Sequence, residues 1–415
     1  MKLQLEGRLW HHQDFLRFWF GDTVSQFTAQ VTGLALPTVA ILLLGASPFE
    51  MGILGTLQLL AFPTLGLFVG VWADRYRRRP IMIIANLGRM AILGSIPIAS
   101  TTGLLSMNLL YVVAVITGVC TVFFDVSYQS YLPVLIDKAD LVEGNSKLQL
   151  SASVGQVGGQ ALAGFLVDLV GAARAIAVDA GGFLTSALAL LSIKKQEPKP
   201  QSTTDPNFFN EMKDGARVVL GSRILRNIAG CTATSNLGSS IFFVVFLIFA
   251  YRDLHLSPSL MGVIFSIGSA GVLFGAWVAG PTSKKLGLGR SIALSSMGNI
   301  GLLIVPLALY FSPIVILAVG QVVAGALTAI YNINQVSLRQ AITPDRLQGR
   351  MNATMRTIVW GTIPLGSFLG GVLGGSIGII STIILGAVIS ILAVLWILPS
   401  PVMGLDSIPE QTQAS

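Results

Sequence analysis

Apolar residues are gathered into twelve long stretches, and polar residues lie mainly in short connections between them. Each stretch has about 20 or more residues, the length that a helix needs to cross a hydrocarbon core of about 30 Å. Continuous apolar runs of this length indicate helices, because a helix satisfies its own backbone hydrogen bonds inside lipid. We therefore predict an all-α membrane protein with twelve transmembrane helices, at about residues 15–44, 50–73, 80–101, 105–131, 146–171, 175–194, 224–250, 259–281, 289–310, 313–338, 351–376 and 379–398.

The chain contains an internal repeat of about 200 residues. Residues 47–52 read SPFEMG, and residues 257–262, 210 positions later, read SPSLMG. Gly164 corresponds to Gly371 at nearly the same offset, within similar glycine-rich stretches. Parallel repeats in a membrane protein are typical of transporters in which two bundles enclose a central site. The repeat predicts two six-helix bundles of the same topology.

Polar segments divide the chain further. The central one begins as a Pro- and Lys-rich linker and continues with an expected surface helix near residues 208–220. The polar, Pro-containing end of the chain predicts a disordered tail. The predicted organisation is an N-terminal bundle at 1–193, a cytoplasmic linker at 194–222, a C-terminal bundle at 223–398 and a cytoplasmic tail at 399–415.

Composition excludes a soluble globular protein, since 53% of residues are hydrophobic, 11% are charged and the mean hydropathy is +0.75. The net charge of +7 would suit nucleic-acid binding in a soluble chain, but its distribution points elsewhere. Only Arg174 and Arg252 fall in loops on the side opposite the termini. The positive-inside rule therefore predicts a multi-pass protein of the inner (plasma) membrane with both termini cytoplasmic, and no nucleic-acid partner. The first apolar run is too long for a cleavable signal.

No residue pattern indicates catalysis or a cofactor. Cys120 and Cys231 lie in apolar stretches of different halves, and the three histidines have no companion ligands. A membrane enzyme would need a nucleophile with a base or a metal cluster, and an ATP-driven pump would need a P-loop. We expect no enzyme activity, catalytic residue, metal or cofactor, and a monomer.

The connection after the second stretch has a distinct pattern, GVWADRYRRR at residues 70–79. Gly70 would let two helices approach, and the Asp74 carboxylate would bind a neighbouring helix end while arginines hold it. The second copy, at residues 280–290, keeps glycine and basic residues but has no acid in place of Asp74. A latch built on this loop is therefore asymmetric.

This loop resembles the signature G-x-x-x-D-R-x-x-R-R of the major facilitator superfamily. The strings FFDVSYQSYLP at 123–133 and SLRQAITPDRLQGRMNATMRTIVWGTIPLGSFLGG at 337–371 resemble the subgroup of bacterial macrolide efflux proteins and the enterobactin exporter. The resemblance covers nearly the whole chain and implies the major facilitator fold. It also implies a secondary active transporter that exports amphiphilic small molecules, such as a drug, siderophore or related metabolite, by proton antiport with alternating access. Its expected partners are the substrate, the lipid bilayer and the proton gradient.

Two alternatives stay open, because the residues alone do not set the direction of transport. One is uptake, or lipid or lysolipid flipping, by the same fold. The remote one is a non-transporting membrane receptor or enzyme.

Contact between the Asp74 loop and Arg356 would hold the cytoplasmic side shut. The candidates for this cytoplasmic gate are Gly70, Asp74, Arg75, Arg78, Arg79, Arg350 and Arg356.

Ionisable groups inside hydrocarbon cost several kcal/mol unless they are paired or hydrated, so each one is a candidate for proton coupling. Either Arg89 forms a structural ion pair with Asp125 or Asp22, or one of these carboxylates exchanges a proton while its pairing changes. We expect Asp179 in a structural cluster at the outer edge, with Arg174 and Asp168. The second-half stretches contain no acid in their interiors. The buried-charge candidates are therefore Asp22, Arg89, Asp125 and Asp179.

Uncharged polar residues in the apolar stretches complete the candidate site. Many such side chains only bond neighbouring helices. Those that we expect to face a substrate cavity are Gln26, Gln30, Gln58, Asn236, Asn332 and Gln335.

Overall fold

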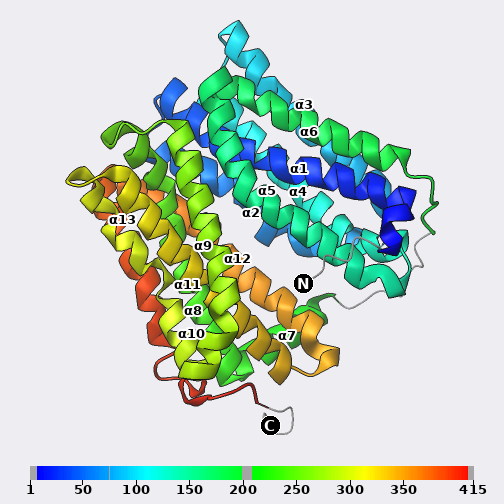
Figure 1. The fold of residues 1–415 in the computed structure, drawn as a ribbon, viewed down its shortest axis with the longest axis vertical. Helices are drawn as coiled ribbons and strands as arrows, with labels where there is room; N and C mark the ends of the chain where they lie inside the picture. Colours follow the sequence, from blue (N-terminus) through cyan, green and yellow to red (C-terminus); the bar gives the residue numbers. More distant parts are fainter. Residues whose placement is uncertain (1–6, 74, 199–207, 410–415) are drawn as a thin grey trace. The chain divides into compact units, whose positions relative to one another are not determined.

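A computed structural model describes residues 7–73, 75–198 and 208–409, and all regular elements in these ranges are helices (Figure 1). Within these ranges, twelve helical segments are long and apolar enough to cross a membrane. A bilayer offers the backbone no hydrogen-bond partners, so each segment satisfies its own N–H and C=O groups as a helix. The predicted all-α class and the number of spans are confirmed.

The first half of the described chain holds six of these helices, with ends about one turn from the predicted ones. Short 3-10 helices, η1 (Arg8–His11) and η3 (Lys138–Asp140), precede the first and fifth of them. The six are α1 (Gln13–Thr38), α2 (Pro48–Ala73), α3 (Arg78–Thr102), α4 (Met107–Leu135), α5 (Leu141–Val170) and α6 (Ala172–Ser192).

The expected surface helix is present as α7 (Phe208–Gly221), which packs on α12 and buries Val219. In the second half, α9 continues through the basic loop that follows the eighth predicted stretch, so Lys284 and Lys285 lie on its last turn. The remaining spans are α8 (Arg223–Ile248), α9 (Pro258–Leu286), α10 (Leu288–Ser296) with η5 (Gly298–Leu309), α11 (Pro313–Ile342), α12 (Asp345–Ser376) and α13 (Ile379–Leu392) with η6 (Ala393–Trp396).

The internal repeat is visible in the backbone geometry. α1 runs into a π-helical turn, η2 (Val39–Leu43), and α8 runs into the same kind of turn 210 positions later, η4 (Phe249–Asp253). One residue just beyond each turn has a left-handed backbone, Gly45 with φ 67° and His255 with φ 54°. The two halves therefore repeat a local conformation as well as an apolar pattern.

Contacts group the chain into two compact units. Unit 1 contains Met1–Gly45, Leu60–Ser202 and Ser257–Ser266, and unit 2 contains Ala46–Leu59, Thr203–Leu256 and Ile267–Ser415. Each unit thus includes the first part of one helix from the other half, α9 in unit 1 and α2 in unit 2. The division into bundles at 1–193 and 223–398 stays a prediction.

Both units pack their helices in the same order. Within unit 1, α1 packs on α5 and α6, and α3 packs on α4 and α6. Within unit 2, α8 packs on α12 and α13, and η5 packs on α11 and α13. These are the pairings expected if the second half repeats the first.

Glycines allow α2 and α9 to approach their neighbours closely. In unit 2, a Cβ added to Gly52 of α2 would lie 2.7 Å from the Cα of Gly371 in α12. In unit 1, a Cβ added to Gly262 of α9 would lie 2.9 Å from the Cα of Gly164 in α5. Backbones this close leave no room for a larger side chain, which explains the glycines at matched positions of the repeat.

The ninth predicted stretch, 289–310, is not one continuous α-helix. α10 ends at Ser296, and η5 continues as a 3-10 helix of 12 residues. Gly298 favours a break because glycine is a poor helix former, and Pro306 lacks a backbone N–H. A 3-10 segment of this length is unusual, and it places irregular backbone inside unit 2.

The tail differs from the disordered segment predicted at 399–415. It forms η7 (Pro401–Gly404) and buries Val402 completely. The carbonyl of Leu405 accepts a hydrogen bond of 2.7 Å from the backbone N–H of Gly289, at the start of α10. The tail therefore satisfies N–H groups that a helix start leaves without intrahelical partners. Residues 410–415 lie outside the described residues.

The two left-handed positions provide a stability test. Gly45→Val should lower the thermal midpoint of the detergent-purified protein, because an L-residue in this conformation costs roughly 1–2 kcal/mol. His255→Gly, the matched change in the second half, should keep or raise the midpoint. Differential scanning fluorimetry measures both, and a Gly45→Val protein as stable as the wild type would contradict the left-handed geometry.

Candidate functional site

Buried charges converge within unit 1. Asp22 of α1, Arg89 of α3 and Asp179 of α6 expose only 4%, 5% and 1% of their surfaces. Asp125 of α4 acts electrostatically on both Asp22 and Arg89. Arg89 lies about 16 Å along α3 from its first residue, at ~1.5 Å per residue. The structure therefore brings together all four residues predicted as buried charges.

Arg89 is held by aromatic rings and an amide. Its guanidinium carbon lies 4.4 Å from the ring centre of Phe124 in α4 and 4.1 Å from that of Phe183 in α6. Arg89 also donates a hydrogen bond to the Asn86 side chain, which in turn donates to the Ser186 hydroxyl at 3.0 Å. Desolvated cation–π contacts contribute about 2 kcal/mol each, so the rings offset part of the cost of burying this charge.

The carboxylates are surrounded by neutral polar groups. The side chains of Tyr128 and Gln26 lie beside Asp22. The hydroxyls of Thr28 and Thr32 lie beside Asp179. One oxygen of each carboxylate, Oδ2 of Asp22 and Oδ1 of Asp179, has no hydrogen-bond partner in the described part of the chain. These oxygens retain capacity to bind a proton or a donor group.

The charges in this cluster do not balance. One guanidinium, that of Arg89, faces the negative charges of Asp125 and Asp179, and Asp125 also faces Asp22. With every group ionised, the cluster would carry excess negative charge within membrane-spanning helices, which is costly. Binding of a cation or proton is the chemical event that relieves this excess.

Unit 2 contains a neutral polar pocket beside the junction between α10 and η5. Its volume is about 50 Å³, enough for one or two water molecules at about 30 Å³ each. None of its lining residues carries a carboxylate or a basic group; they are Cys231, Thr232, Ser235, Asn236, Ser295, Ser296, Gly298, Asn299, Thr328, Tyr331 and Asn332.

Hydroxyl and amide groups near this pocket are linked to one another. Asn299 donates to Ser239 at 2.5 Å and also to Ser390 of α13. The hydroxyls of Thr232 and Tyr331 lie 2.7 Å apart. The network fixes the irregular η5 segment to α8 and α13.

The predicted cavity residues have different positions. Asn236 and Asn332 come together in the unit 2 pocket, where Asn332 is exposed and Asn236 donates to the backbone of α12. Gln26 joins the charge cluster through Asp22, whereas Gln30 packs over Gly159 of α5. Two further candidates are the partly buried Gln58 of α2 and the buried Gln335, whose Oε1 makes no hydrogen bond to described residues.

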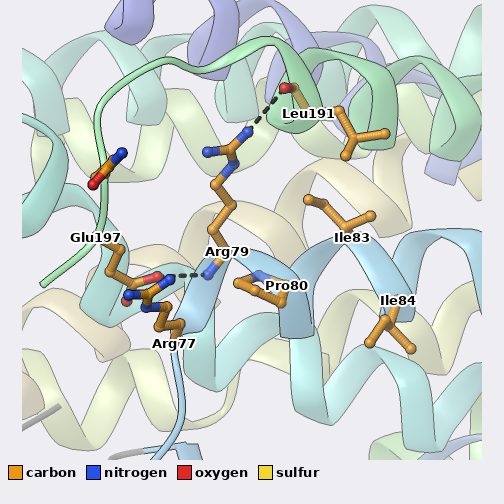
Figure 2. Close-up of a pocket in the computed structure, with 8 residues that line it drawn as sticks. Arg77, Arg79, Pro80, Ile83, Ile84, Leu191 and Glu197 are labelled. Carbon is orange, nitrogen blue, oxygen red and sulfur yellow. Dashed lines mark hydrogen bonds between the residues drawn. The ribbon is translucent and has the colours of Figure 1, made fainter. Parts of the chain in front are cut away.

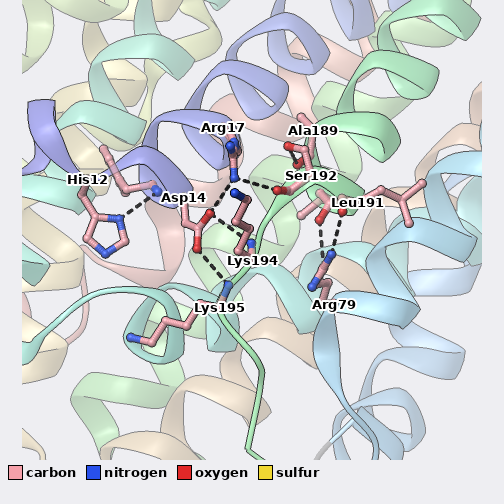
Figure 3. A network of polar contacts seen from close by, with 11 residues as sticks. His12, Asp14, Arg17, Arg79, Ala189, Leu191, Ser192, Lys194 and Lys195 are labelled. Carbon is pink, nitrogen blue, oxygen red and sulfur yellow. Dashed lines mark hydrogen bonds and ion pairs between the residues drawn. The ribbon is translucent and has the colours of Figure 1, made fainter.

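Arginines of the predicted gate have partners within unit 1. Glu197 of the linker accepts hydrogen bonds from the backbone N–H groups of Arg78 and Arg79, at 2.8 and 3.0 Å. The Arg79 side chain donates to the carbonyls of Leu190 and Leu191 at the end of α6 (Figure 3). These arginines therefore join α3, α6 and the linker, an arrangement that the gate hypothesis did not include.

Other gate candidates remain predictions. Asp74 lies outside the described residues, whereas Gly70 lies on the last turn of α2. Arg75 is exposed, and the backbone of Arg350 packs against α7. Arg356 is exposed on α12, with its guanidinium carbon 4.5 Å from the ring centre of Trp360.

Asp179 was predicted to lie in a cluster with Arg174 and Asp168 at the outer edge of the membrane. In the structure it lies near Arg89 instead. Asp168 instead accepts a hydrogen bond from the Ser259 backbone N–H at 3.0 Å, and Arg174 is exposed. Asp179 lies one turn further into α6, on the side that faces Arg89. Sequence position placed Asp179 near Arg174, but helix orientation separates them.

Three residues that lie close to the buried charges were not predicted, although their spacing in the sequence could have identified them. Asn86 precedes Arg89 by three positions, Tyr128 follows Asp125 by three, and Phe183 follows Asp179 by four. Residues at these spacings share one face of a helix. The spacing would have identified them; Thr28 and Thr32 face Asp179 from another helix and left no such signal.

The double stacking of Arg89 predicts that lysine cannot replace it. Arg89→Lys keeps the charge but loses the planar group between two rings, so the thermal midpoint should fall by the equivalent of about 1–2 kcal/mol. Arg356→Lys, at an exposed single stack, is the matched control and should change little. Thermal unfolding of the purified variants measures both, and equal stability of Arg89→Lys and wild type would contradict the role given to the rings.

The sequence matches a known protein family and curated exporters. A model of the transmembrane secretion effector family matches residues 10–414. The chain is 25% identical over 387 residues to the enterobactin exporter EntS of Salmonella typhi, covering 91% of this chain and 89% of that protein. It is likewise 25% identical over 380 residues to EntS of Escherichia coli O139:H28, covering 89% and 86%.

Solved transporter structures share the fold. A bacterial homologue of the iron transporter ferroportin, in an inward-facing state, aligns with a TM-score of 0.75 at 13% identity, covering 93% of this chain and 98% of the other. The nucleoside transporter NupG aligns with a TM-score of 0.70 at 13% identity and the same coverage. Twelve apolar helices together with these matches indicate a multi-pass protein of the inner membrane. The chain belongs to the transmembrane secretion effector family of the major facilitator superfamily, and it is a transporter rather than an enzyme.

Proposed function

We propose that the protein exports an amphiphilic small molecule from the cytoplasm by proton antiport with alternating access. Export is supported by the family and by the relatives named as enterobactin exporters. Alternating access is supported by the repeated packing order of the two units, which is typical of transporters built from parallel repeats. Both termini are proposed to be cytoplasmic, as the distribution of basic residues favours.

The observation that carries the coupling proposal is the excess of carboxylates around Arg89. Asp22, Asp125 and Asp179 share one buried guanidinium through direct or successive electrostatic contacts. A proton on one carboxylate would let Arg89 balance the remaining charge, and loss of that proton would restore the imbalance. Proton occupancy would thereby bias the positions of the helices that carry these groups, α1, α3, α4 and α6.

Unit 2 suits the recognition of uncharged polar groups. Its pocket offers hydroxyl and amide groups, and none of its lining residues is ionisable at neutral pH. Such groups can hydrogen-bond to one small polar group of an amphiphile, such as a hydroxyl, without the desolvation cost of a charge, and the pocket volume of about 50 Å³ admits no more than that. An antiporter must bind both protons and substrate. In this proposal unit 1 binds the proton, and unit 2 binds an uncharged polar group of the substrate.

Transport by reconstituted protein tests the proposal. Vesicles with an acidic interior should accumulate enterobactin or a macrolide through wild-type protein that is inserted with its cytoplasmic side outward. Accumulation should stop when an ionophore collapses the pH gradient. Asp22→Asn should reduce gradient-driven accumulation to near background, because the amide keeps the size of the side chain but cannot bind and release the proton.

Asp137→Asn is the matched control, since Asp137 is an exposed residue of unit 1 outside the cluster. It should transport as the wild type does. Gradient-driven accumulation that persists in Asp22→Asn, Asp125→Asn and Asp179→Asn alike would refute coupling through this cluster. Failure of wild-type protein to move either probe would refute the proposed substrate class.

A further inference from the structure

A second cavity lies at the end of unit 1 where α3 begins and α6 gives way to the linker. Its volume is about 540 Å³, much larger than the pocket in unit 2. Figure 2 shows Pro80, Ile83 and Ile84 of α3 on one side and Leu191 of α6 on the other. None of its lining residues belongs to the charge cluster around Arg89 or to the pocket of unit 2.

One wall of the cavity is apolar and faces outward from the helices. Ile84 is 70% exposed and Leu191 is 53% exposed, although both belong to membrane-spanning helices. Exposed aliphatic side chains on such helices contact hydrocarbon. Ile84 lies about 9 Å along α3 from its first residue, at ~1.5 Å per residue, so this wall lies near the membrane edge.

The other wall is cationic. The guanidinium of Arg79 is fixed at the cavity by hydrogen bonds of 2.8 Å to the carbonyls of Leu190 and Leu191. These bonds use neutral acceptors, so the positive charge of Arg79 is not neutralised by them. Arg77 is exposed and forms no hydrogen bond or ion pair with the residues that the structure describes.

The acid at the cavity is committed to other groups. Glu197 accepts hydrogen bonds from the backbone N–H groups of Arg78 and Arg79, the first two residues of α3. It also forms an ion pair with the Arg78 side chain at 3.5 Å. A carboxylate at a helix start is satisfied by these donors. Glu197 therefore shapes the floor of the cavity, and the charge of Arg77 remains available to a ligand.

We propose that this cavity binds an anionic phospholipid, with its phosphate on Arg77 and Arg79 and an acyl chain along Ile83, Ile84 and Leu191. The adjoining apolar and cationic walls match the two parts of such a lipid. A free phosphate would use only the arginines, and a zwitterionic lipid would bring its own cation to a site that already has two. Basic pockets between helices at the cytoplasmic face are typical sites for anionic headgroups.

Purified full-length protein tests this site directly. Native mass spectrometry and thermal unfolding should show binding and stabilisation by dioleoylphosphatidylglycerol, with little effect of dioleoylphosphatidylcholine or glycerol 1-phosphate at the same concentration. Arg77→Gln should weaken phosphatidylglycerol binding about fivefold, the effect expected from removing one basic contact near a membrane surface. Arg174→Gln, an exposed arginine at the opposite end of unit 1, is the control and should bind normally.

A second pair of variants tests the apolar wall. Ile84→Gln should weaken binding of the lipid, whereas Ile98→Gln, at a position 66% exposed further along α3, should not. Equal affinity for phosphatidylglycerol and phosphatidylcholine, or wild-type affinity in both Arg77→Gln and Ile84→Gln, would overturn the proposal. Stabilisation by glycerol 1-phosphate equal to that by the lipid would also overturn it and would indicate a site for soluble anions.

Discussion

A guanidinium within a membrane-spanning helix costs several kcal/mol unless nearby groups compensate its charge, and the packing of unit 1 follows from that constraint at Arg89. Two aromatic rings cover its faces, and the Asn86 side chain accepts a hydrogen bond from it. Acids on neighbouring helices supply the opposite charge. Because these partners come from α3, α4 and α6, the charge holds the helices in one arrangement. The acids of this cluster outnumber its one guanidinium, which is the observation on which the proposed proton coupling rests.

The two halves of the chain share a scaffold but differ in chemistry. The π-helical turns after α1 and α8, the left-handed residues Gly45 and His255 and the order of helix pairing are all repeated. Unit 1 contains the buried carboxylates, whereas the pocket of unit 2 is lined by hydroxyls and amides. The helical break at Ser296 has no counterpart in α3, which is continuous. The two halves thus share a backbone frame and differ in the polar residues that it carries.

Features that depend on local pattern could be predicted from the sequence, and features that depend on distant contacts could not. Apolar length predicted twelve spans, and isolated charges in those spans predicted the cluster around Arg89. The tail was expected to be disordered, because composition does not show that Leu405 binds the start of α10. The contact of Glu197 with the start of α3 was not predicted, because the two segments are more than a hundred residues apart in the chain. Asp179 was assigned to the wrong neighbours because the orientation of α6 was unknown.

The central claim is that substrate binding and proton binding are linked through the carboxylates around Arg89. Isothermal titration calorimetry of a probe that the reconstituted protein transports, repeated in buffers of different ionisation enthalpy at one pH, tests it most directly. The account predicts that the wild-type binding enthalpy varies with the buffer, because the substrate displaces protons from the cluster. It also predicts that the dependence is lost or reduced when the carboxylates are replaced by amides. The same enthalpy in every buffer for the wild type would contradict the account.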